Sequence, residues 1–247
     1  MKDLTLVTCS YNTPKVTMSM LRSFYQHHKN LVTKINLILM ENSTNDYTVK
    51  CLEENNIPYI RNEGGTHSVS VDAALKKVKT RYALLTDTDV IYHKSISTIF
   101  NVFKTGKYAS MGRLGESRGG YRLMPRICPW FQLMDMEQIN SKGISFHDQK
   151  RIEMTNSTEF FQNIPVKQNE GGIYYDVGST FLQDLLSNGL TVASANYEGN
   201  IFTHYEGMSW HKNVTGTAYV KLGEYVEKRF LDDCKIYSHV NIKNRYK

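Results

Sequence analysis

The sequence has 247 residues, of which 40% are hydrophobic and 22% are charged, and its formal net charge is +6. This length and composition fit a globular protein of one large α/β domain or two small ones, and no apolar stretch is long enough to span a bilayer. The basic balance favours anionic partners, such as nucleotide diphosphates, nucleic acid or an anionic membrane face.

Strands and helices are predicted to alternate over the first hundred residues. Residues 4–8 form a β-rich run, and a helix is expected to begin at Pro14, whose fixed φ suits a first helical turn. The same patterns then predict a strand over 35–40, a helix over 47–55, a strand over 58–60, a helix over 68–79 and a strand over 82–85. This alternation indicates a mostly parallel sheet with helices on both faces.

Polar clusters follow three of the predicted strands. They comprise residues 9–14, residues 41–46 and residues 86–89, which end in the sequence Asp-Thr-Asp. Ligands of open α/β sheets bind beyond the carboxyl ends of the strands. The three clusters are therefore expected to converge on one crevice.

Asp87 and Asp89 are the candidate metal ligands of this crevice. They are two residues apart, so in an extended segment both carboxylates point the same way, just past a buried strand. Carboxylate oxygens suit Mg²⁺ or Mn²⁺, which can stabilise a departing diphosphate as a Lewis acid. Asp-x-Asp also occurs in turns and helix caps, and its position after the strand favours the metal site.

Two further helices are predicted in the second half of the chain. Residues 174–188 carry an apolar face that includes Leu186, and Gly189 stands where a helix usually ends. Residues 218–236 predict an amphipathic helix packed on the domain, with a helix lying on a membrane surface as the alternative. The prolines at 125 and 129 exclude a simple long helix between residues 118 and 130.

Four segments, 7–12, 41–43, 70–75 and 84–89, resemble in order and spacing the motifs of GT-A fold glycosyltransferases of family 2, including small enzymes of bacterial and phage genomes. The resemblance implies one GT-A-like domain over residues 1–247. Residues 1–110 would bind the nucleotide sugar, 111–215 would form the acceptor and catalytic half, and 216–247 a helical tail. The chain departs from the family where Val71 replaces an arginine, Asp72 an asparagine and Val90 an acidic residue.

The resemblance also implies which side chains hold the donor. Those expected to contact the base, ribose or diphosphate are Thr8, Ser10, Tyr11, Asn12, Glu41, Asp87 and Thr88, with His67 near the place of the missing arginine. Glu41 would accept hydrogen bonds from the base or sugar edge. The alternatives are a helix N-cap for Ser10 or Asn12 and a solvated turn for Glu41.

By the same resemblance, Asp176 is the general base that deprotonates the acceptor hydroxyl in an inverting transfer. The alternatives are that Asp176 caps a helix and that Glu170 is the base. His204 is expected to complete the metal shell, since an imidazole suits Mn²⁺ better than Mg²⁺, or else to be a surface or a hydrogen-bonded histidine.

An acceptor site is expected among basic and aromatic residues, with Arg126, Trp130 and Trp210 as its candidates. The alternatives are a solvated loop for the arginine and a small core for Trp210.

The sequence thus predicts a metal-dependent glycosyltransferase that uses a nucleotide-diphosphate sugar and Mn²⁺ or Mg²⁺. Its acceptor would be a saccharide or glycolipid, or a DNA base. The rival functions are a sugar nucleotidyltransferase, whose glycine-rich loop is missing after Val7, and a non-catalytic carbohydrate- or nucleic-acid-binding protein. Residues 4–8 are too short for a signal-peptide core, so we expect a cytoplasmic protein, at most peripheral to the inner membrane face, or in the host cytoplasm if phage-encoded. The sequence does not predict an oligomeric state.

Overall fold

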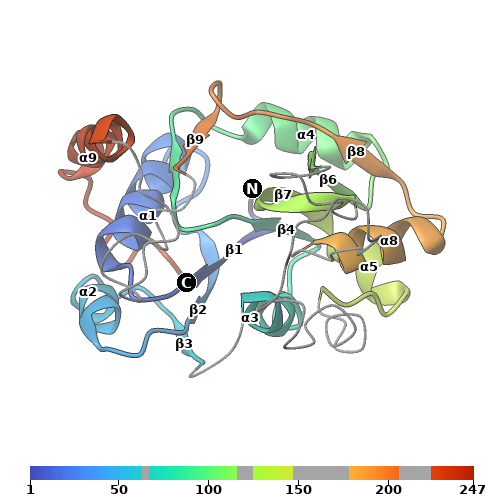
Figure 1. Ribbon diagram of the computed structural model, residues 1–247, viewed down its shortest axis with the longest axis horizontal. Coiled ribbons are helices and arrows are strands. Elements are labelled where there is room, and N and C mark those ends of the chain that lie inside the picture. Colours follow the sequence, from blue (N-terminus) through green and yellow to red (C-terminus); the bar gives the residue numbers. More distant parts are fainter. Residues whose placement is uncertain (63–66, 116–124, 147–177, 206–223) are drawn as a thin grey trace, which may run out of the picture.

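A central sheet with helices on both faces organises the chain in the computed structural model (Figure 1). The structure describes residues 1–62, 67–115, 125–146, 178–205 and 224–247. Its first elements are β1 (Leu4–Ser10), α1 (Pro14–His28), β2 (Asn36–Glu41), α2 (Tyr47–Glu54), β3 (Ile60–Arg61), α3 (His67–Leu75), β4 (Tyr82–Leu85) and β5 (Val90–Tyr92). The later ones are α4 (Ser97–Thr105), β6 (Ser110–Gly115), β7 (Arg126–Asp135), α5 (Met136–Ser141), α8 (Ser179–Ser187), β8 (Val192–Ser194), β9 (Phe202–His204) and α9 (Glu224–Tyr237).

The main sheet has seven strands in the order β3-β2-β1-β4-β7-β6-β8, and β5 pairs separately with β9. Strands β3, β2, β1 and β4 are parallel, as is the pair β6–β8, whereas β7 runs antiparallel to both of its neighbours. The predicted mostly parallel α/β sheet is therefore confirmed. The parallel strands β1, β2 and β4 bring their carboxyl ends to one edge, which places the three polar clusters there.

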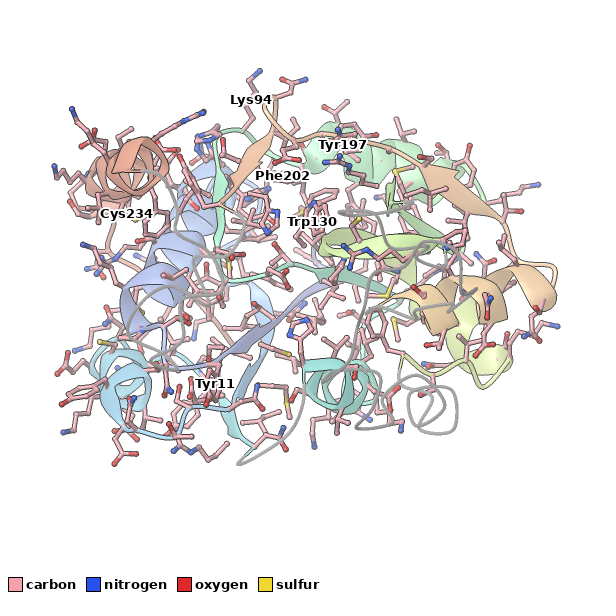
Figure 2. All side chains as sticks on the ribbon, in the orientation of Figure 1. Tyr11, Lys94, Trp130, Tyr197, Phe202 and Cys234 are labelled. Atoms are coloured by element: carbon pink, nitrogen blue, oxygen red, sulfur yellow. The ribbon has the colours of Figure 1, made fainter. Side chains whose placement is uncertain are left out.

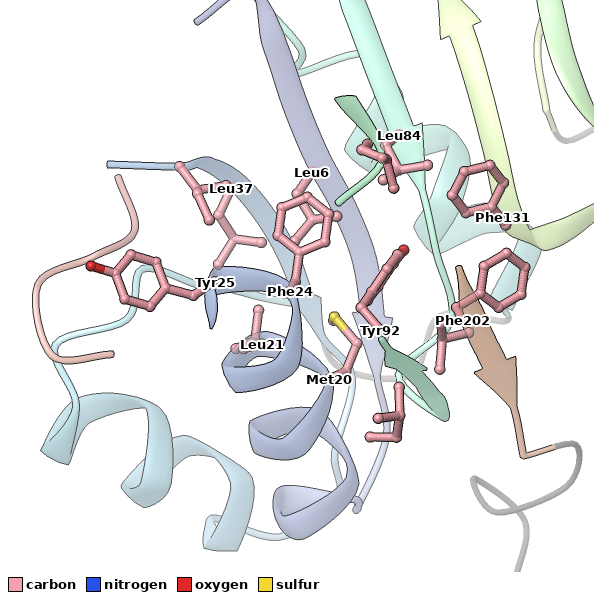
Figure 3. Packing of buried hydrophobic residues seen from close by; sticks show 14 of the residues in the cluster. Leu6, Met20, Leu21, Phe24, Tyr25, Leu37, Leu84, Tyr92, Phe131 and Phe202 are labelled. Carbon is pink, nitrogen blue, oxygen red and sulfur yellow. The ribbon is translucent and has the colours of Figure 1, made fainter. Parts of the chain in front are cut away.

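Two apolar clusters cover the two faces of the sheet. Side chains alternate along β1, so that Leu6 packs on one face and Val7 on the other. The face with Leu6 is covered by α1, α4 and α9, whereas α3, α5 and α8 cover the face with Val7. Figure 3 shows the first of these clusters, in which Phe24 of α1 lies against Leu6 of β1 and beside Tyr92 of β5.

The predicted elements of the first half are confirmed to within a few residues. The helix from Pro14 begins at that proline, and the strand over 82–85 has the expected bounds. Two expectations were less accurate. The third strand begins at Ile60 and is only two residues long, and the helix expected over 68–79 ends at Leu75.

A long strand, β7, occupies the segment where the prolines exclude a helix. Pro129 lies inside this strand, although proline cannot donate to a ladder. The pairing with β6 is interrupted there, because the register jumps between the pairs Gly112–Gln132 and Leu114–Ile127. The proline therefore stands at an irregularity of the ladder, where a missing N–H is tolerated.

The helix expected over 174–188 begins later than predicted. It begins at Ser179, and Gly178 holds its N-cap position with φ +89°, whereas residues 174–177 of the expected helix lie outside the described residues. At the other end Gly189 follows the helix with φ +70°, as expected for a residue that terminates a helix. Leu186 does not belong to the buried face, because 57% of it is exposed.

The last helix, α9, packs on α1. Its Phe230, Cys234 and Tyr237 are buried in the same cluster as Phe24. No helix among the residues described is long and apolar enough to cross a membrane.

His28, at the end of α1, makes folding stability depend on pH. Its side chain is fully buried; Nδ1 lies 2.6 Å from the Phe24 carbonyl, to which it donates, and Nε2 accepts from the Ile96 N–H at 3.0 Å. The bond from Ile96 needs an unprotonated Nε2 and therefore the neutral ring, and burial lowers the pKa of His28 from 6.5 to about 4. A lowered pKa means that this stability is fully present above pH 6.5 and is lost as the pH falls toward 4.

We therefore expect the free energy of unfolding to fall by about 3 kcal/mol between pH 6.5 and 4 through this group alone. Urea titrations of the wild type and of His28→Gln across this range measure the effect. The variant, which has no imidazole at this position, should lose less stability over the interval. Parallel curves for the two proteins would contradict the expectation.

Candidate active site

The loop between β4 and β5 carries the two aspartates, and hydrogen bonds of Thr86 anchor its first residue. Thr86, immediately before Asp87, donates a side-chain hydrogen bond to the Trp130 carbonyl at 2.9 Å and accepts one from the buried Tyr92 hydroxyl at 3.0 Å. The Thr86 N–H also donates to the Val7 carbonyl at 3.0 Å. These bonds tie the start of the loop, at Thr86, to β1, β5 and β7, so Asp87 directly follows an anchored residue.

Asp87, Asp89 and His204 form a group that can hold a metal ion, with one ligand atom of each within 4.8 Å of the others. His204 is the last residue of β9 and pairs with Val90 of β5, next to Asp89. Its Nε2 lies 3.4 Å from Asp89 Oδ1. The third member of the group thus comes from a strand that is far away in the sequence.

The electrostatics of this group favour a bound cation. Burial raises the pKa of Asp87, and the nearby charge of Asp89 raises it further. Burial lowers the pKa of His204, but the hydrogen bond and charge of Asp89 outweigh burial, so this pKa is raised overall. Two carboxylates held together with little solvent repel each other, and a divalent cation relieves that repulsion. Two carboxylates and an imidazole are a donor set that suits Mn²⁺.

Trp130 packs directly on the metal group. Its ring stacks on His204 with centroids 4.6 Å apart and an angle of 15° between the planes. The guanidinium carbons of Arg113 and Arg126 lie 5.9 and 5.8 Å from the centre of the Trp130 ring. Arg126 is buried, and its charge lowers the pKa of Asp87. The two described acceptor candidates, Arg126 and Trp130, therefore lie beside the metal group.

His67, the first residue of α3, lies near Asp87 of the same group. Its Nε2 lies 3.7 Å from Asp87 Oδ1, and 35% of its side chain is exposed. At the end of β1, burial and the charge of Asp87 raise the pKa of Cys9. The carboxyl ends of β1 and β4 and the start of α3 thus surround Asp87.

Asn12 joins the loops that follow β1 and β2. It has a left-handed backbone with φ 52°, and its Oδ1 accepts from the Thr44 N–H at 3.1 Å and from Asn45 Nδ2 at 2.8 Å. Its own N–H donates to Ser43 Oγ at 2.7 Å. The convergence predicted for the first two polar clusters is therefore a direct hydrogen-bonded contact.

Glu41 lies beneath these loops rather than at their surface. Its side chain is fully buried, and it accepts hydrogen bonds from the Ser10 hydroxyl and, at 2.6 Å, from the Ser43 N–H. Arg61 Nη1 lies 3.6 Å from the same carboxylate. Glu41 is not the solvated turn that was one expectation, because its oxygens bind the protein itself.

The remaining donor candidates differ in exposure. Thr8 is fully buried, and its hydroxyl has no hydrogen-bond partner in the part of the chain that the structure describes. Thr88 is also buried, whereas Tyr11 is partly exposed. Tyr11 lies well away from Trp130 (Figure 2). Tyr11 and Trp130 therefore mark separate parts of the predicted donor and acceptor regions.

Three predicted site residues, Glu170, Asp176 and Trp210, lie outside the described residues. Conversely, sequence reasoning missed the pairing of β5 with β9 and the stacking of Trp130 on His204. The only signals for that pairing are the two short β-prone runs Val90–Tyr92 and Phe202–His204, which do not identify each other as partners.

Two residues of α3, Val71 and Asp72, differ from the residues usual in the family pattern, and both have structural roles. Val71 is fully buried in the cluster that covers this face of the sheet. Asp72 forms an ion pair with Lys76 at 2.6 Å and accepts hydrogen bonds from Ser145 Oγ at 2.7 Å and the Phe146 N–H at 2.9 Å. Asp72 therefore attaches α3 to the segment that follows α5.

Comparison with known proteins agrees with this arrangement. The sequence model of glycosyl transferase family 2 matches residues 5–166, which is more than half of the chain. No curated protein matches the chain in sequence.

Two solved structures are similar in fold. A mannosyltransferase from Pyrobaculum calidifontis, in complex with GDP-Man and Mn²⁺, is 12% identical with a TM-score of 0.52, and the match covers 78% of this chain and 54% of that one. The galactosyltransferase LgtC, in complex with donor and acceptor sugar analogs, is 14% identical with a TM-score of 0.55, over 94% of this chain and 95% of that one. The chain thus spans about half the length of the first and nearly all of the second.

Proposed function

Because the chain belongs to glycosyl transferase family 2, and is therefore a nucleotide-sugar-dependent glycosyltransferase of GT-A fold, we propose that its reaction depends on a divalent metal ion held by Asp87, Asp89 and His204. The observation that carries this proposal is the approach of the three ligand atoms to within 4.8 Å of one another. The Mn²⁺ in the mannosyltransferase complex supports the same metal here. Membership of the family decides against the rival functions of nucleotidyltransferase and non-catalytic binding protein.

The ion would act as a Lewis acid toward the diphosphate of the donor and so stabilise the leaving group. The chain's own contribution is to orient its ligands: β4 ends two residues before Asp87, and the pairing of Val90 with His204 across β5 and β9 places Asp89 beside His204. Mn²⁺ fits the mixed carboxylate and imidazole donors better than Mg²⁺ does.

The donor is proposed to lie across residues 1–110, over the carboxyl ends of β1, β2 and β4. Tyr11 and His67 are assigned direct contacts with the donor, because both keep exposed surface at this edge. Asn12 and Glu41 are assigned the shaping of the two loops, since their oxygens already accept hydrogen bonds from the protein. The buried residues Thr8, Ser10 and Thr88 lie beneath them.

The acceptor and catalytic groups are proposed to come from residues 111–215. Asp176 is assigned as the general base of an inverting transfer, with Glu170 as the alternative, on the resemblance of the segment Tyr174–Gly178 to that of the family. The base would take the proton of the acceptor hydroxyl as its oxygen bonds to the anomeric carbon, while the bond from that carbon to the diphosphate breaks.

A saccharide-bearing acceptor is the proposed class. The support is the complex of LgtC with an acceptor sugar analog, in a fold that matches nearly the whole chain. Neither of the two solved structures is named as acting on DNA. Arg126, which lies beside the metal group, would meet an anionic part of the donor or acceptor, and Trp210 remains a candidate for stacking on a sugar face.

The test is a panel of nucleotide sugars incubated with the purified chain, with saccharides as acceptors. Release of nucleoside diphosphate is measured with Mn²⁺, with Mg²⁺ and with EDTA. We expect turnover of one donor class with Mn²⁺ and its loss in EDTA. Turnover that persists unchanged in EDTA would refute the metal requirement.

The same assay separates the two candidate bases. Asp176→Asn should lose transfer by roughly 10²-fold or more while donor binding is retained, and Glu170→Gln should behave as the wild type. The reverse result would assign the base to Glu170.

A further inference from the structure

A hydrogen bond connects the last helix to the residue next to the metal group. Tyr205 directly follows His204, and only 2% of it is exposed. Its hydroxyl donates to the carboxylate of Asp233 in the middle of α9. Its backbone N–H donates to the Asp89 carbonyl at 2.8 Å. Tyr205 therefore binds Asp89 through its main chain and follows His204 in the sequence. Its side chain is held by the distant helix α9.

We propose that Asp233 is a positioning residue for the metal ligand His204 and acts through Tyr205. This inference rests on the metal site proposed above. Asp233 does not belong to that site itself, since its carboxylate lies on α9 and binds Tyr205. Its role is to fix the backbone from which the imidazole projects.

The local structure explains why His204 needs such support. Strands β5 and β9 are only three residues long each, and β9 ends at His204. So short a two-stranded pair is weak by itself. Stacking on Trp130 orients the imidazole ring, but it does not fix the main chain that follows.

The helix that carries Asp233 is firmly attached to the core. The ring of Phe230, one turn earlier on α9, packs edge-on against Tyr205 with centroids 5.2 Å apart. Tyr237, one turn later, lies with its hydroxyl 3.1 Å from His27 Nε2 of α1. The attachment of α9 to the core thus reaches the end of β9 through Tyr205, which packs on Phe230 and donates its hydroxyl hydrogen bond to Asp233.

A second contact brings β5 into the same arrangement. His93, which follows β5, places Nε2 2.9 Å from Thr203 Oγ1 of β9 and 4.0 Å from Asp233 Oδ2. Both strands of the pair therefore approach Asp233. Partners of metal ligands that lie outside the coordination shell typically change metal affinity by 10- to 100-fold when they are removed.

The experiment measures Mn²⁺ binding and does not depend on turnover. Free Mn²⁺ is followed by electron paramagnetic resonance during titration of the full chain, with Mn²⁺ alone and with UDP or GDP added in separate titrations. Tyr205→Phe keeps the packed ring and removes the bond to Asp233, so we expect Mn²⁺ to bind roughly 10-fold more weakly. Asp233→Asn keeps an acceptor oxygen, so its loss should be smaller than that of Asp233→Ala.

Tyr237→Phe is the matched control. It removes a hydroxyl from the same helix, but one that contacts α1 instead of the strand of His204. Its Mn²⁺ affinity should stay within about two-fold of the wild type, and urea unfolding shows whether each variant is folded. Equal weakening in Tyr205→Phe and Tyr237→Phe would mean general loosening of α9 and would overturn the proposal.

Two other outcomes separate this inference from the proposed function. If the wild type binds Mn²⁺, Asp89→Asn does not, and Tyr205→Phe binds as tightly as the wild type, then only the role of Asp233 is refuted. If the wild type binds no Mn²⁺ with or without a nucleoside diphosphate, then the metal site and this inference both fail.

Discussion

Asp89→Asn is expected to lower kcat/KM for sugar transfer by roughly 10³-fold, which corresponds to about 4 kcal/mol of transition-state stabilisation. The substitution keeps the shape of a side chain that is almost fully buried, but removes the charge that lies 3.4 Å from the imidazole of His204. Without that charge, the remaining carboxylate and imidazole would hold a divalent ion weakly. Steady-state kinetics at several Mn²⁺ concentrations measure the effect.

Asp232→Asn is the matched control for this substitution. Asp232 lies on α9, its side chain is 53% exposed, and its partner is the exposed Lys235. The same chemical change there should leave transfer unchanged. A second signature is thermal: Mn²⁺ should raise the midpoint of unfolding of the wild type and of Asp232→Asn, but not that of Asp89→Asn. Wild-type turnover by Asp89→Asn, with donor binding also unchanged, would eliminate the proposed metal site.

Gly178→Ala is expected to destabilise the fold by about 3 kcal/mol. Gly178 holds the N-cap position of α8 with φ +89°, a backbone conformation that is strained for residues with a Cβ. A Cβ added there would lie only 2.2 Å from the carbonyl oxygen of Ile127 in β7. That atom belongs to the main chain of a paired strand, so it cannot move aside as the end of a flexible side chain can.

Gly189→Ala isolates the contribution of the backbone angle. Gly189 has φ +70° at the other end of the same helix, and a Cβ there would meet nothing within 4 Å. We expect a loss of about 1 kcal/mol from the left-handed conformation alone. Urea unfolding of both variants gives the difference. Equal losses would show that the contact between Gly178 and β7 contributes nothing to stability.

The sequence predicted the first half of the fold because its signals are local. Strands β1, β2 and β4 are each built on a short run of β-prone residues, and Pro14 marks the start of a helix by its own geometry. Parallel strands joined by helices then place the polar strand ends at one edge, whatever the details of packing. The position of Asp87 beside the end of β1 followed from this topology.

The rest depended on contacts between distant segments, which no local pattern encodes. Glu41 has the residue type of a ligand-binding carboxylate, but the Ser10 hydroxyl and the Ser43 N–H occupy its oxygens. Trp130 has the residue type of a sugar-stacking platform, but in the structure it stacks on His204. The start of α8 was placed too early because helical periodicity does not reveal the left-handed angle of Gly178.

The pairing of β5 with β9 has a consequence for any shortened version of the chain. The region by which the family is recognised ends at residue 166, whereas His204 and the strand that holds it lie beyond that limit. A fragment cut to the family boundary would keep both aspartates and the strand ends of the proposed donor site. It would also leave β5 as a bare edge without its partner, open to pairing with other chains. The segment that matches the family therefore ends before the strand that completes the β5–β9 pair.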